Sequence, residues 1–473
     1  MRDQANRPSR SWWGWGWADQ ALDDAECHAL AGRVRAFLPL DGHLTAPPRA
    51  DAITLPAARV QPPPSLASWC TAATPVRCAH TYGKAYRDVV RALQGDLSSA
   101  PDLVAFPERE EDVTAVLDWA GRAGVAVVPY GGGTSVVGGV ECRDRSRAVL
   151  SLDLSRLTGV LDLDEVNLAA RIQAGTLGPA IEDVLRPRGL TLRHFPQSFE
   201  FSTLGGWLAT RAGGHYATGY THIDDLVEAI RIVTPMGVSA SARVPASGAG
   251  PAADRLWLGS EGTLGVITEA WVRLQRRPTF VKSAAIRFST LADGATATRI
   301  IAQSGLRPAN CRLLDPLESM LGAGVADGSC RLLLSFESAD HPVESELARA
   351  VDICAAQSGT LESPGNDAGR QWRDAFLRAP YQRDALARLG VIVETFETCC
   401  TWTAFESLHA AVVDAITLAA IEITGAPAAV GCRFTHVYPD GPAPYFTVYA
   451  AGRRGAEVEI WDAFKAAASD AIL

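Results

Sequence analysis

A glycine-rich loop, PYGGGTSVVGG, spans residues 129–139. Its three successive glycines leave backbone N–H groups unobstructed, and Thr134 and Ser135 add two hydroxyl donors. Such a loop suits a pyrophosphate, although by itself it fits a tight structural turn equally well. The Rossmann fingerprint is excluded because, counted from Gly131, its third glycine falls on Val136. A Walker loop is excluded because no Gly-Lys-Ser/Thr follows.

Further loops of the same kind occur downstream. The stretch QSFEFSTLGGW (197–207) combines serine, threonine and paired glycines, and it is followed by TRAGG (210–214), where Arg211 is placed to neutralise a phosphate or a reduced flavin. The stretch SEGTLGVITEAWV (260–272) runs from a glycine-flanked loop into an alternating strand. A turn does not require hydroxyls and glycines together, so these loops point to one shared ligand site.

The elements that must position these loops form an α+β pattern. Before residue 278, strands are expected at 103–106, 125–128, 148–152, 169–174, 226–234 and 265–274, with helices at 108–121 and 178–186. After residue 278, strands at 283–288, 311–314, 331–336, 431–437 and 445–449 alternate with helices near 291–304, 342–356, 403–420 and 456–472. We therefore predict one domain over 101–278, and over 279–473 an α/β cap domain built on an antiparallel sheet with helices on one face.

The first hundred residues show few periodic segments and read as an irregular N-terminal extension packed on the body. Four tryptophans (Trp12, Trp13, Trp15 and Trp17) stand near its start. They favour packing on the protein's own surface, and contact with a membrane interface is the alternative.

Composition narrows the function classes. The chain has 473 residues, is 47% apolar, and carries a formal charge of −9 (44 basic against 53 acidic residues), which disfavours disorder and nucleic-acid binding. The most apolar stretch, 410–423, is interrupted by Asp414 and Glu422, so a membrane span is not expected. The N-terminus lacks an apolar signal region, which favours the cytoplasm. The 10 cysteines and the histidines show no metal-ligand spacing, so no metal is expected.

In this order and spacing, PYGGGTSVVGG, SFEFSTLGGWLATRAGG, DLVEAIRIVTPMG and WLGSEGTLGVITEA resemble the FAD-binding domain of the vanillyl-alcohol oxidase and p-cresol methylhydroxylase superfamily. Members with covalent flavin often place a histidine just after the glycines, where this chain has Thr134 and Ser135, so noncovalent FAD is expected. The resemblance implies FAD contacts at Pro129, Tyr130, Gly131, Gly132, Gly133, Thr134, Ser135, Gln197, Ser198, Phe199, Glu200, Phe201, Ser202, Thr203, Thr210, Arg211, Ala212, Gly213, Glu261, Gly262, Thr263, Leu264, Gly265, Val266 and Ile267.

Four other segments are similar to the alkyldihydroxyacetonephosphate synthase family: WWGWGW, RPANCRLLD, APYQRDALARLGVIVETFET and CRFTHVYPDGPAPYF. The resemblance implies a redox-neutral exchange in ether-lipid synthesis. The acyl chain of acyl-dihydroxyacetone phosphate, a lipid-like phosphate substrate, is replaced by a fatty alcohol through an adduct at flavin N5. Peripheral membrane contact and a homodimer stay open.

The same resemblance assigns functional positions to Arg312, Arg383 and Tyr445. A guanidinium suits a substrate phosphate, whereas pairing with neighbouring aspartates is the structural alternative. Tyr445 can abstract a proton beside the ketone only if a cation or the flavin lowers its pKa; otherwise it is an ordinary strand aromatic. His436 suits phosphate orientation or proton transfer, with a structural role as the alternative.

Two other functions are compatible with this sequence. One is an FAD-linked dehydrogenase of 2-hydroxy acids such as D-lactate or glycolate, which shares the first domain. The other is a non-catalytic flavin-binding protein. In the synthase family a run of histidines follows the segment that here ends EVEIWDAFKAAASDAIL, so we expect those histidines to be missing from this chain.

Overall fold

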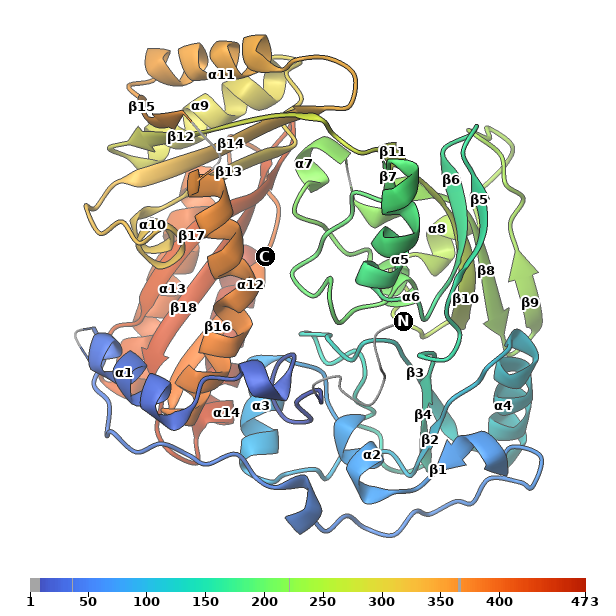
Figure 1. Ribbon diagram of the computed structural model, residues 1–473. Helices are drawn as coiled ribbons and strands as arrows, with labels where there is room; N and C mark the ends of the chain where they lie inside the picture. Colours follow the sequence, from blue (N-terminus) through green and yellow to red (C-terminus); the bar gives the residue numbers. More distant parts are fainter. Residues whose placement is uncertain (1–8, 36, 221, 365–366) are drawn as a thin grey trace. The chain divides into compact units, whose positions relative to one another are not determined.

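The computed structural model describes residues 9–35, 37–220, 222–364 and 367–473 (Figure 1). The first eight residues of the predicted N-terminal extension lie outside the described residues. The chain forms two compact units, and both are discontinuous in sequence. Unit 1 contains Met1–Pro47, Tyr216–Tyr220 and Pro278–Leu473, and unit 2 contains Pro48–His215 and Thr221–Arg277. Unit 1 therefore takes the first part of the predicted extension and unit 2 takes the rest.

One sheet of unit 2 delivers the glycine-rich loop. Its strand order is β1-β2-β4-β3, with β2 and β3 parallel to β4 and β1 antiparallel to β2. Helix α4 (Glu110–Ala123) makes the crossover between β2 and β3 and ends at Gly124, whose φ of 65° is the left-handed geometry of a helix C-cap. The loop begins where β3 ends. The strands are β1 (Cys70–Thr71), β2 (Leu103–Ala105), β3 (Ala126–Tyr130) and β4 (Val149–Asp153).

The second sheet of unit 2 is antiparallel and carries the other two loops. Its order is β5-β6-β10-β8-β9, and β7 pairs separately with β11. These strands are β5 (Val160–Asp164), β6 (Ala169–Gln173), β7 (Leu190–Thr191), β8 (Val227–Thr234), β9 (Gly237–Ala240), β10 (Val266–Arg273) and β11 (Gln275–Arg276). The α-helices that accompany them are α5 (Gly178–Leu185), α6 (Leu204–Thr210) and α8 (Asp254–Trp257), with 3-10 turns at Arg186–Arg188 and Ile223–Leu226.

Residues 48–100 are more regular than their sequence indicates. They form helices α2 (Thr74–Ala79) and α3 (Tyr86–Leu93), with 3-10 turns at Ala50–Ala52 and Ala67–Trp69. The apolar face of α3 is buried, with Val89 and Val90 almost fully covered. Both helices are short, so their periodicity is too brief to be recognised in an isolated sequence.

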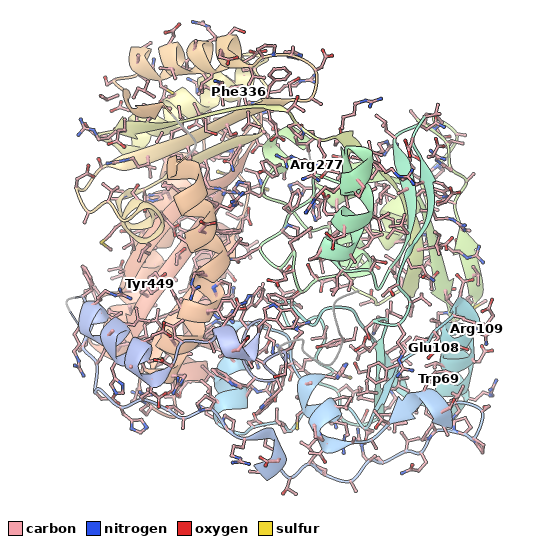
Figure 2. The ribbon with its side chains drawn as sticks, viewed as in Figure 1. Trp69, Glu108, Arg109, Arg277, Phe336 and Tyr449 are labelled. Carbon is pink, nitrogen blue, oxygen red and sulfur yellow. The ribbon has the colours of Figure 1, made fainter. Side chains whose placement is uncertain are left out.

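Unit 1 is built on a seven-stranded sheet of order β15-β12-β14-β13-β17-β18-β16, in which every pair is antiparallel. Its strands are β12 (Phe280–Phe288), β13 (Asn310–Leu314), β14 (Cys330–Ser338), β15 (Thr360–Pro364), β16 (Val391–Glu397), β17 (Ala429–Val437) and β18 (Pro442–Ala451). Phe336 on β14 belongs to the apolar core of this unit (Figure 2).

Helices cover both faces of this sheet, and not one face as the sequence pattern suggested. The apolar core lies under α9 (Leu291–Gln303), α11 (Glu344–Ala356), α13 (Phe405–Thr424) and α14 (Glu457–Ile472). The opposite face contacts α10 (Pro316–Ala323) and α12 (Asp367–Arg388). Helix α12 was not predicted from the sequence, because Pro380 and many charged residues interrupt its pattern. The unit also contains α1 (Asp24–Val34), α7 (Ala217–Tyr220) and a 3-10 turn at Ala18–Gln20.

Among the described residues, one helix is long and apolar enough to cross a membrane by length and composition alone. This helix is α13, with a mean hydropathy of 1.5 over an 18-residue window. Val412 and Ile416 of this helix are buried in the core of unit 1, and the helix packs along α14, while only 17% of the apolar window is buried.

Candidate functional site

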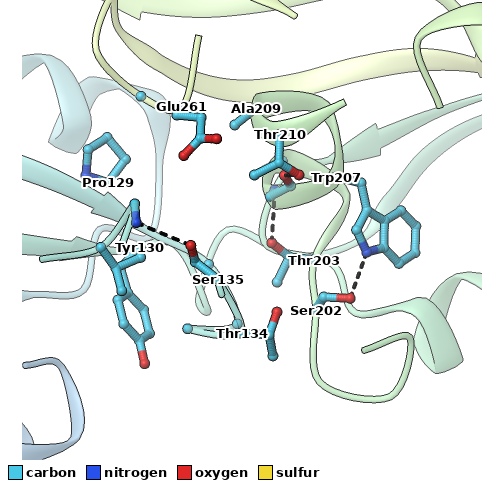
Figure 3. A pocket seen from close by; sticks show the side chains of 18 of the residues that line it. Pro129, Tyr130, Thr134, Ser135, Ser202, Thr203, Trp207, Ala209, Thr210 and Glu261 are labelled. Carbon is cyan, nitrogen blue, oxygen red and sulfur yellow. Dashed lines mark hydrogen bonds between the residues drawn. The ribbon is translucent and has the colours of Figure 1, made fainter. Parts of the chain in front are cut away.

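The three glycine-rich loops of unit 2 meet around one cavity of about 330 Å³ (Figure 3). The cavity is lined by Pro129, Tyr130, Gly131, Gly132, Gly133, Thr134, Ser135, Val136, Val137, Gly139, Val140, Leu154, Ser198, Ser202, Thr203, Gly205, Gly206, Trp207, Ala209, Thr210, Ala212, Ser260, Glu261, Gly262, Gly265 and Ile267. The loops are far apart in sequence, and the two sheets of the unit bring them together.

Backbone contact between the first two loops explains the glycines. A Cβ on Gly132 would lie 1.8 Å from the carbonyl oxygen of Phe201, and one on Gly131 would lie 2.4 Å from the Thr203 Oγ1. Gly133 has a φ of 65°, which L side chains rarely adopt. These residues are therefore glycines because the loop backbone lies directly on the loop that precedes α6.

Side-chain hydroxyls order the second loop. Thr203 is the N-cap of α6, and its Oγ1 accepts the N–H of Gly206 at 3.3 Å. The Trp207 indole N–H donates to the Ser202 Oγ at 2.6 Å (Figure 3). That hydroxyl donates in turn to the Ser198 carbonyl at 2.8 Å. These hydrogen bonds hold the loop in the conformation that forms this wall of the cavity.

The third loop closes against the other two. Glu261 adopts a φ of 50°, and its N–H donates to the Ala209 carbonyl at 2.9 Å. A Cβ on Gly262 would lie 2.9 Å from the ring of Pro129. Glycine is therefore required where this loop passes the end of β3.

Residues 80–84, for which no role was predicted from the sequence, contact the glycine-rich loop and support it. The Lys84 N–H donates to the Ser135 carbonyl at 2.6 Å, and a Cβ on Gly83 would lie 2.2 Å from that same oxygen. The His80 ring lies 4.3 Å from the Tyr130 ring, centroid to centroid, while its Nε2 is 2.8 Å from Asp153. No motif in the sequence marks these residues, because their role depends on the tertiary contact.

The chemistry of the lining fits a dinucleotide flavin. Unobstructed backbone N–H groups and the hydroxyls of Thr134 and Ser135 can hold a pyrophosphate. Val136 and Val137 also line the cavity and are 54% and 71% exposed, which suits contact with an apolar aromatic ring. These residues would hold FAD through its pyrophosphate and its planar rings.

The predicted cofactor residues divide into two groups. The cavity lining includes all seven from Pro129 to Ser135, together with Ser198, Ser202, Thr203, Thr210, Ala212, Glu261, Gly262, Gly265 and Ile267. It does not include Gln197, Phe199, Glu200, Phe201, Arg211, Gly213, Thr263, Leu264 or Val266. Arg211 forms an ion pair with Asp224 at 2.9 Å instead. The lining residues that the sequence analysis did not assign are Val136, Val137, Gly139, Val140, Leu154, Gly205, Gly206, Trp207, Ala209 and Ser260.

In unit 1, Tyr445 lies in a charged row on the sheet face that is turned to α10 and α12. It is opposite Arg433 on β17 and opposite Glu397 on β16 in the strand register. The Arg433 guanidinium lies 3.8 Å from the centre of the Tyr445 ring and pairs with Glu318 at 2.7 Å. Burial raises the pKa of Tyr445, and the positive charge of Arg433 opposes that rise. A cation is thus present beside Tyr445, but burial outweighs it and the pKa of Tyr445 stays above its ordinary value. Arg433 was not among the residues predicted from the sequence.

The two predicted arginines occupy different surroundings. Arg312 on β13 is only 2% exposed and stacks on the Trp372 ring at 4.0 Å; burial lowers its pKa to about 9. Arg383 on α12 pairs with Asp384, Nη2 to Oδ1, at 2.7 Å. Arg312 is therefore buried within unit 1, whereas Arg383 forms an ion pair with the aspartate that follows it in the segment YQRD.

His436 is buried on β17, beyond an irregularity of the strand register between Phe434 and His436. It pairs with Ala443, two residues before Tyr445. His436 and Tyr445 therefore lie on adjacent strands but not opposite each other. Within the part of the chain that the structure describes, no group of three or more His, Cys, Asp or Glu residues is placed to hold a metal ion.

Comparison with known protein families matches both halves of the chain. Residues 101–241 match the FAD binding domain family, and residues 277–471 match the C-terminal domain of the FAD linked oxidases. A solved structure of p-cresol methylhydroxylase shares the fold, with a TM-score of 0.66 at 13% identity over 85% of this chain and 84% of that one. The chain therefore has the vanillyl-alcohol oxidase and p-cresol methylhydroxylase fold with an FAD-binding domain, and FAD is its cofactor.

Within this class the chain is a homologue of the alkyldihydroxyacetonephosphate synthases. The synthase of Dictyostelium discoideum is 31% identical over 78% of this chain. A solved synthase structure superposes with a TM-score of 0.85 at 27% identity, covering 98% of this chain and 93% of that one. The chain spans 64% of the length of the Dictyostelium relative.

Proposed function

We propose that this enzyme exchanges the acyl chain of an acyl-dihydroxyacetone phosphate for a fatty alcohol, a step of ether-lipid synthesis. The acyl group leaves as a carboxylic acid, and the alcohol oxygen forms the new ether bond, so the reaction needs no external oxidant or reductant. The observation that carries this proposal is Tyr445, half-buried under the Arg433 guanidinium, in a chain that has the synthase fold.

Four side chains of unit 1, Tyr445, Arg433, Glu318 and Arg383, have distinct roles in this proposal. Tyr445, as its phenolate, takes the proton from the carbon beside the substrate ketone, and Arg433 stabilises that phenolate before the transfer. Glu318 balances the charge of Arg433 and accepts the Thr447 hydroxyl as well, which holds the guanidinium in place over the ring. Arg383 binds the substrate phosphate, for which a planar guanidinium is well suited. FAD, when bound, supplies the reactive isoalloxazine at which the exchange takes place.

The test is an anaerobic assay of the FAD-loaded chain with palmitoyl-dihydroxyacetone phosphate and hexadecanol. We expect the hexadecyl ether to form with one palmitate released per turnover, while the yellow flavin absorbance returns fully at the end. The rival is an FAD-linked dehydrogenase of 2-hydroxy acids, which D-lactate or glycolate would bleach under the same conditions. Complete bleaching by D-lactate with no ether product would overturn the proposed exchange.

We infer that the FAD is held noncovalently. Thr134 and Ser135 stand at the positions where covalent attachment would need a histidine, and both residues line the cavity. Acid precipitation of the yellow protein should leave the flavin in the supernatant. A flavin that stays with the pellet after extensive washing would contradict this inference.

We further propose that the enzyme works on the cytoplasmic side of a membrane surface as a peripheral protein, because its proposed substrates are lipids. Leu418 and Ile421 on α13 are exposed apolar side chains of the kind that such contact requires. Flotation with phosphatidylcholine vesicles, with and without palmitoyl-dihydroxyacetone phosphate, tests the contact. A chain that stays at the bottom of the gradient under both conditions would contradict it. The homodimer that the sequence analysis left open is tested by analytical ultracentrifugation.

A further inference from the structure

The N-terminal tryptophan segment forms a small closed loop. Arg10 and Trp17 form a β-bridge, and the Ser11 N–H donates to the Gly16 carbonyl at 2.8 Å. The Gly14 N–H donates to the Ser11 hydroxyl at 2.9 Å, which tightens the loop further. We call residues 10–17 the tryptophan loop. Trp15, at its tip, is only 5% exposed, so the loop is packed against the rest of unit 1.

Two backbone amides fix the tryptophan loop to helix α12. The Trp15 N–H donates to the Asp384 Oδ2 at 2.5 Å, and the Trp17 N–H donates to the Tyr381 hydroxyl at 3.0 Å. Tyr381 and Asp384 are the first and last residues of YQRD, the segment that contains Arg383. The loop therefore attaches on both sides of that arginine.

One carboxylate connects the loop to the guanidinium. While Oδ2 of Asp384 accepts the Trp15 amide, Oδ1 of the same carboxylate accepts Nε and Nη2 of Arg383, at 3.1 and 2.7 Å. The Asp384 and Arg383 side chains are only 8% and 14% exposed, so this pair is screened little by solvent. Contact through two nitrogens fixes the plane of the guanidinium as well as its position.

The approach of the loop also explains one of its glycines. A Cβ on Gly14 would lie 2.6 Å from the Asp384 Oδ2 and 3.5 Å from its Cγ. The oxygen in question is the one that accepts the Trp15 amide. Any side chain at position 14 must therefore displace either the tryptophan loop or the carboxylate that holds Arg383.

We propose that the tryptophan loop and Asp384 position Arg383 for the substrate phosphate. This inference rests on the proposed function, in which Arg383 binds that phosphate. Asp384 and Trp15 are positioning residues and do not touch the substrate. A free arginine side chain samples many rotamers, and the chain of contacts from Trp15 through Asp384 removes that freedom before the substrate arrives.

The test measures binding of dihydroxyacetone phosphate, and of dihydroxyacetone without phosphate, to the FAD-loaded chain by isothermal titration calorimetry. The variants are Gly14→Ala, Asp384→Asn and Arg383→Ala. The matched control is Asp374→Asn, which changes an exposed carboxylate of the same helix. We expect the first two variants to weaken the phosphate ligand by about 10-fold and Arg383→Ala by more, with dihydroxyacetone unaffected and the control at the wild-type value.

The outcomes separate the two claims. If Arg383→Ala weakens the phosphate ligand but Gly14→Ala and Asp384→Asn do not, the positioning role is wrong and the phosphate role of Arg383 stands. If Arg383→Ala has no effect, the phosphate role itself is wrong. If the first two variants weaken both ligands equally, the loop only supports folding, and the positioning role is again wrong. Because Asp384→Asn alters a buried group, Gly14→Ala serves as the independent variant if the former fails to fold.

Discussion

Gly132 shows how a single position controls the cofactor cavity. Its Cα faces the Phe201 carbonyl so closely that even a methyl group would overlap the backbone, and backbone atoms cannot rotate away as a side chain does. The sequence predicted this glycine as part of a pyrophosphate loop. It did not predict the partner, because nothing local links residue 132 to residue 201.

We therefore expect Gly132→Ala to lose most of its FAD. The added methyl group forces the two loops apart, and the amide donors then no longer converge on the pyrophosphate. The measurement is the ratio of bound flavin to protein after gel filtration, and at least a 10-fold loss is expected. Gly121→Ala is the control, because this helical glycine has nothing within 4 Å of its Cβ position. A Gly132→Ala chain with full flavin content would contradict the assignment of the cavity.

Tyr445 is the second residue-scale case, because its protonation depends on neighbours from three other elements. Burial raises the pKa of Tyr445 most, Arg433 and a hydrogen bond with Thr395 lower it, and Glu397 and Glu318 raise it further. The sequence indicated that a cation or the flavin must lower the pKa of Tyr445, but it did not identify a cation. The cross-strand register of β17 and β18 decides that Arg433 meets the ring.

Removal of Arg433 should shift the pH dependence of kcat/KM to higher pH. Without the guanidinium, Tyr445 has a higher pKa, so the deprotonated base is available only at more alkaline pH; a shift of about one unit is expected. The variant is Arg433→Gln combined with Glu318→Gln, so that no carboxylate is left buried alone. Glu318→Gln by itself is the control. Because Glu318 raises the pKa of Tyr445, the double variant is compared with Glu318→Gln alone, and the same ascending limb in both would rule out Arg433 as the activating cation.

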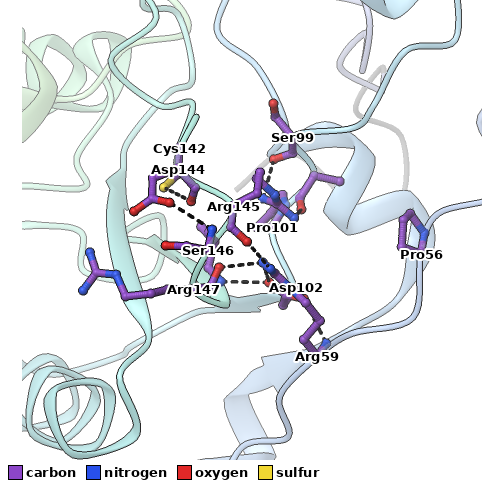
Figure 4. A network of polar contacts seen from close by, with 12 residues as sticks. Pro56, Arg59, Ser99, Pro101, Asp102, Cys142, Asp144, Arg145, Ser146 and Arg147 are labelled. Atoms are coloured by element: carbon purple, nitrogen blue, oxygen red, sulfur yellow. Dashed lines mark hydrogen bonds and ion pairs between the residues drawn. The ribbon is translucent and has the colours of Figure 1, made fainter.

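At the scale of elements, the ion pair between Arg59 and Asp102 adds to the pairing of β1 with β2 in holding the segment 48–100 to the first sheet of unit 2 (Figure 4). Arg59 donates Nε and Nη2 to the two oxygens of Asp102, and its Nη1 and Nη2 also donate to the carbonyls of Arg145 and Arg147. Burial raises the pKa of Asp102, but hydrogen bonds from Arg59 and from the Val149 amide outweigh burial and lower it to about 2.

Arg59→Ala should destabilise the chain by about 3 kcal/mol, because it leaves the Asp102 carboxylate buried without its partner. Urea unfolding at pH 7 measures the change. Arg49→Ala, which breaks the exposed Arg49–Asp51 pair, is the matched control and should change nothing measurable. The pKa of Asp102 is lower in the folded chain, so its ionisation stabilises the fold in a pH-dependent way. This stabilisation is present above pH 3.8 and is lost as the pH falls through about 2. Equal stability of both variants would contradict the anchoring role.

At the scale of the whole molecule, both compact units are discontinuous in sequence. Unit 1 combines residues 1–47 with residues 278–473, and it also contains α7 from the middle of the chain. The cofactor cavity, by contrast, is lined entirely by unit 2. FAD should therefore stabilise unit 2 directly.

Removal of FAD should lower the unfolding temperature, and adding it back should restore the original value. A ligand that binds only the folded state contributes about 2.7 kcal/mol at a concentration 100 times its Kd. The measurement is a thermal melt of the holo, stripped and reconstituted chain. Reconstitution with FMN, which lacks the adenylate and the pyrophosphate, should raise the unfolding temperature by less than reconstitution with FAD. Equal melting of the stripped and FAD-reconstituted samples would contradict the cofactor assignment.

The sequence by itself predicted the flavin domain, because its three glycine-rich loops are local motifs that point to one shared ligand site and, in their order and spacing, resemble an FAD-binding domain. It also determined most strands of the cap domain, since alternation along a strand is a local property. It did not reveal helix α12 or the helices of residues 48–100, whose patterns are short or interrupted by proline and charge.

Tertiary structure alone decided which side chains act together. The pairing of Arg433 with Tyr445, of Asp384 with Trp15 and of Gly132 with Phe201 joins residues that have no relation along the chain. Each pairing follows from strand register or from the docking of one loop on another. Such contacts depend on the packing of the whole fold, and that is why the tryptophan motif was recognised in the sequence while its contact with Asp384 was not.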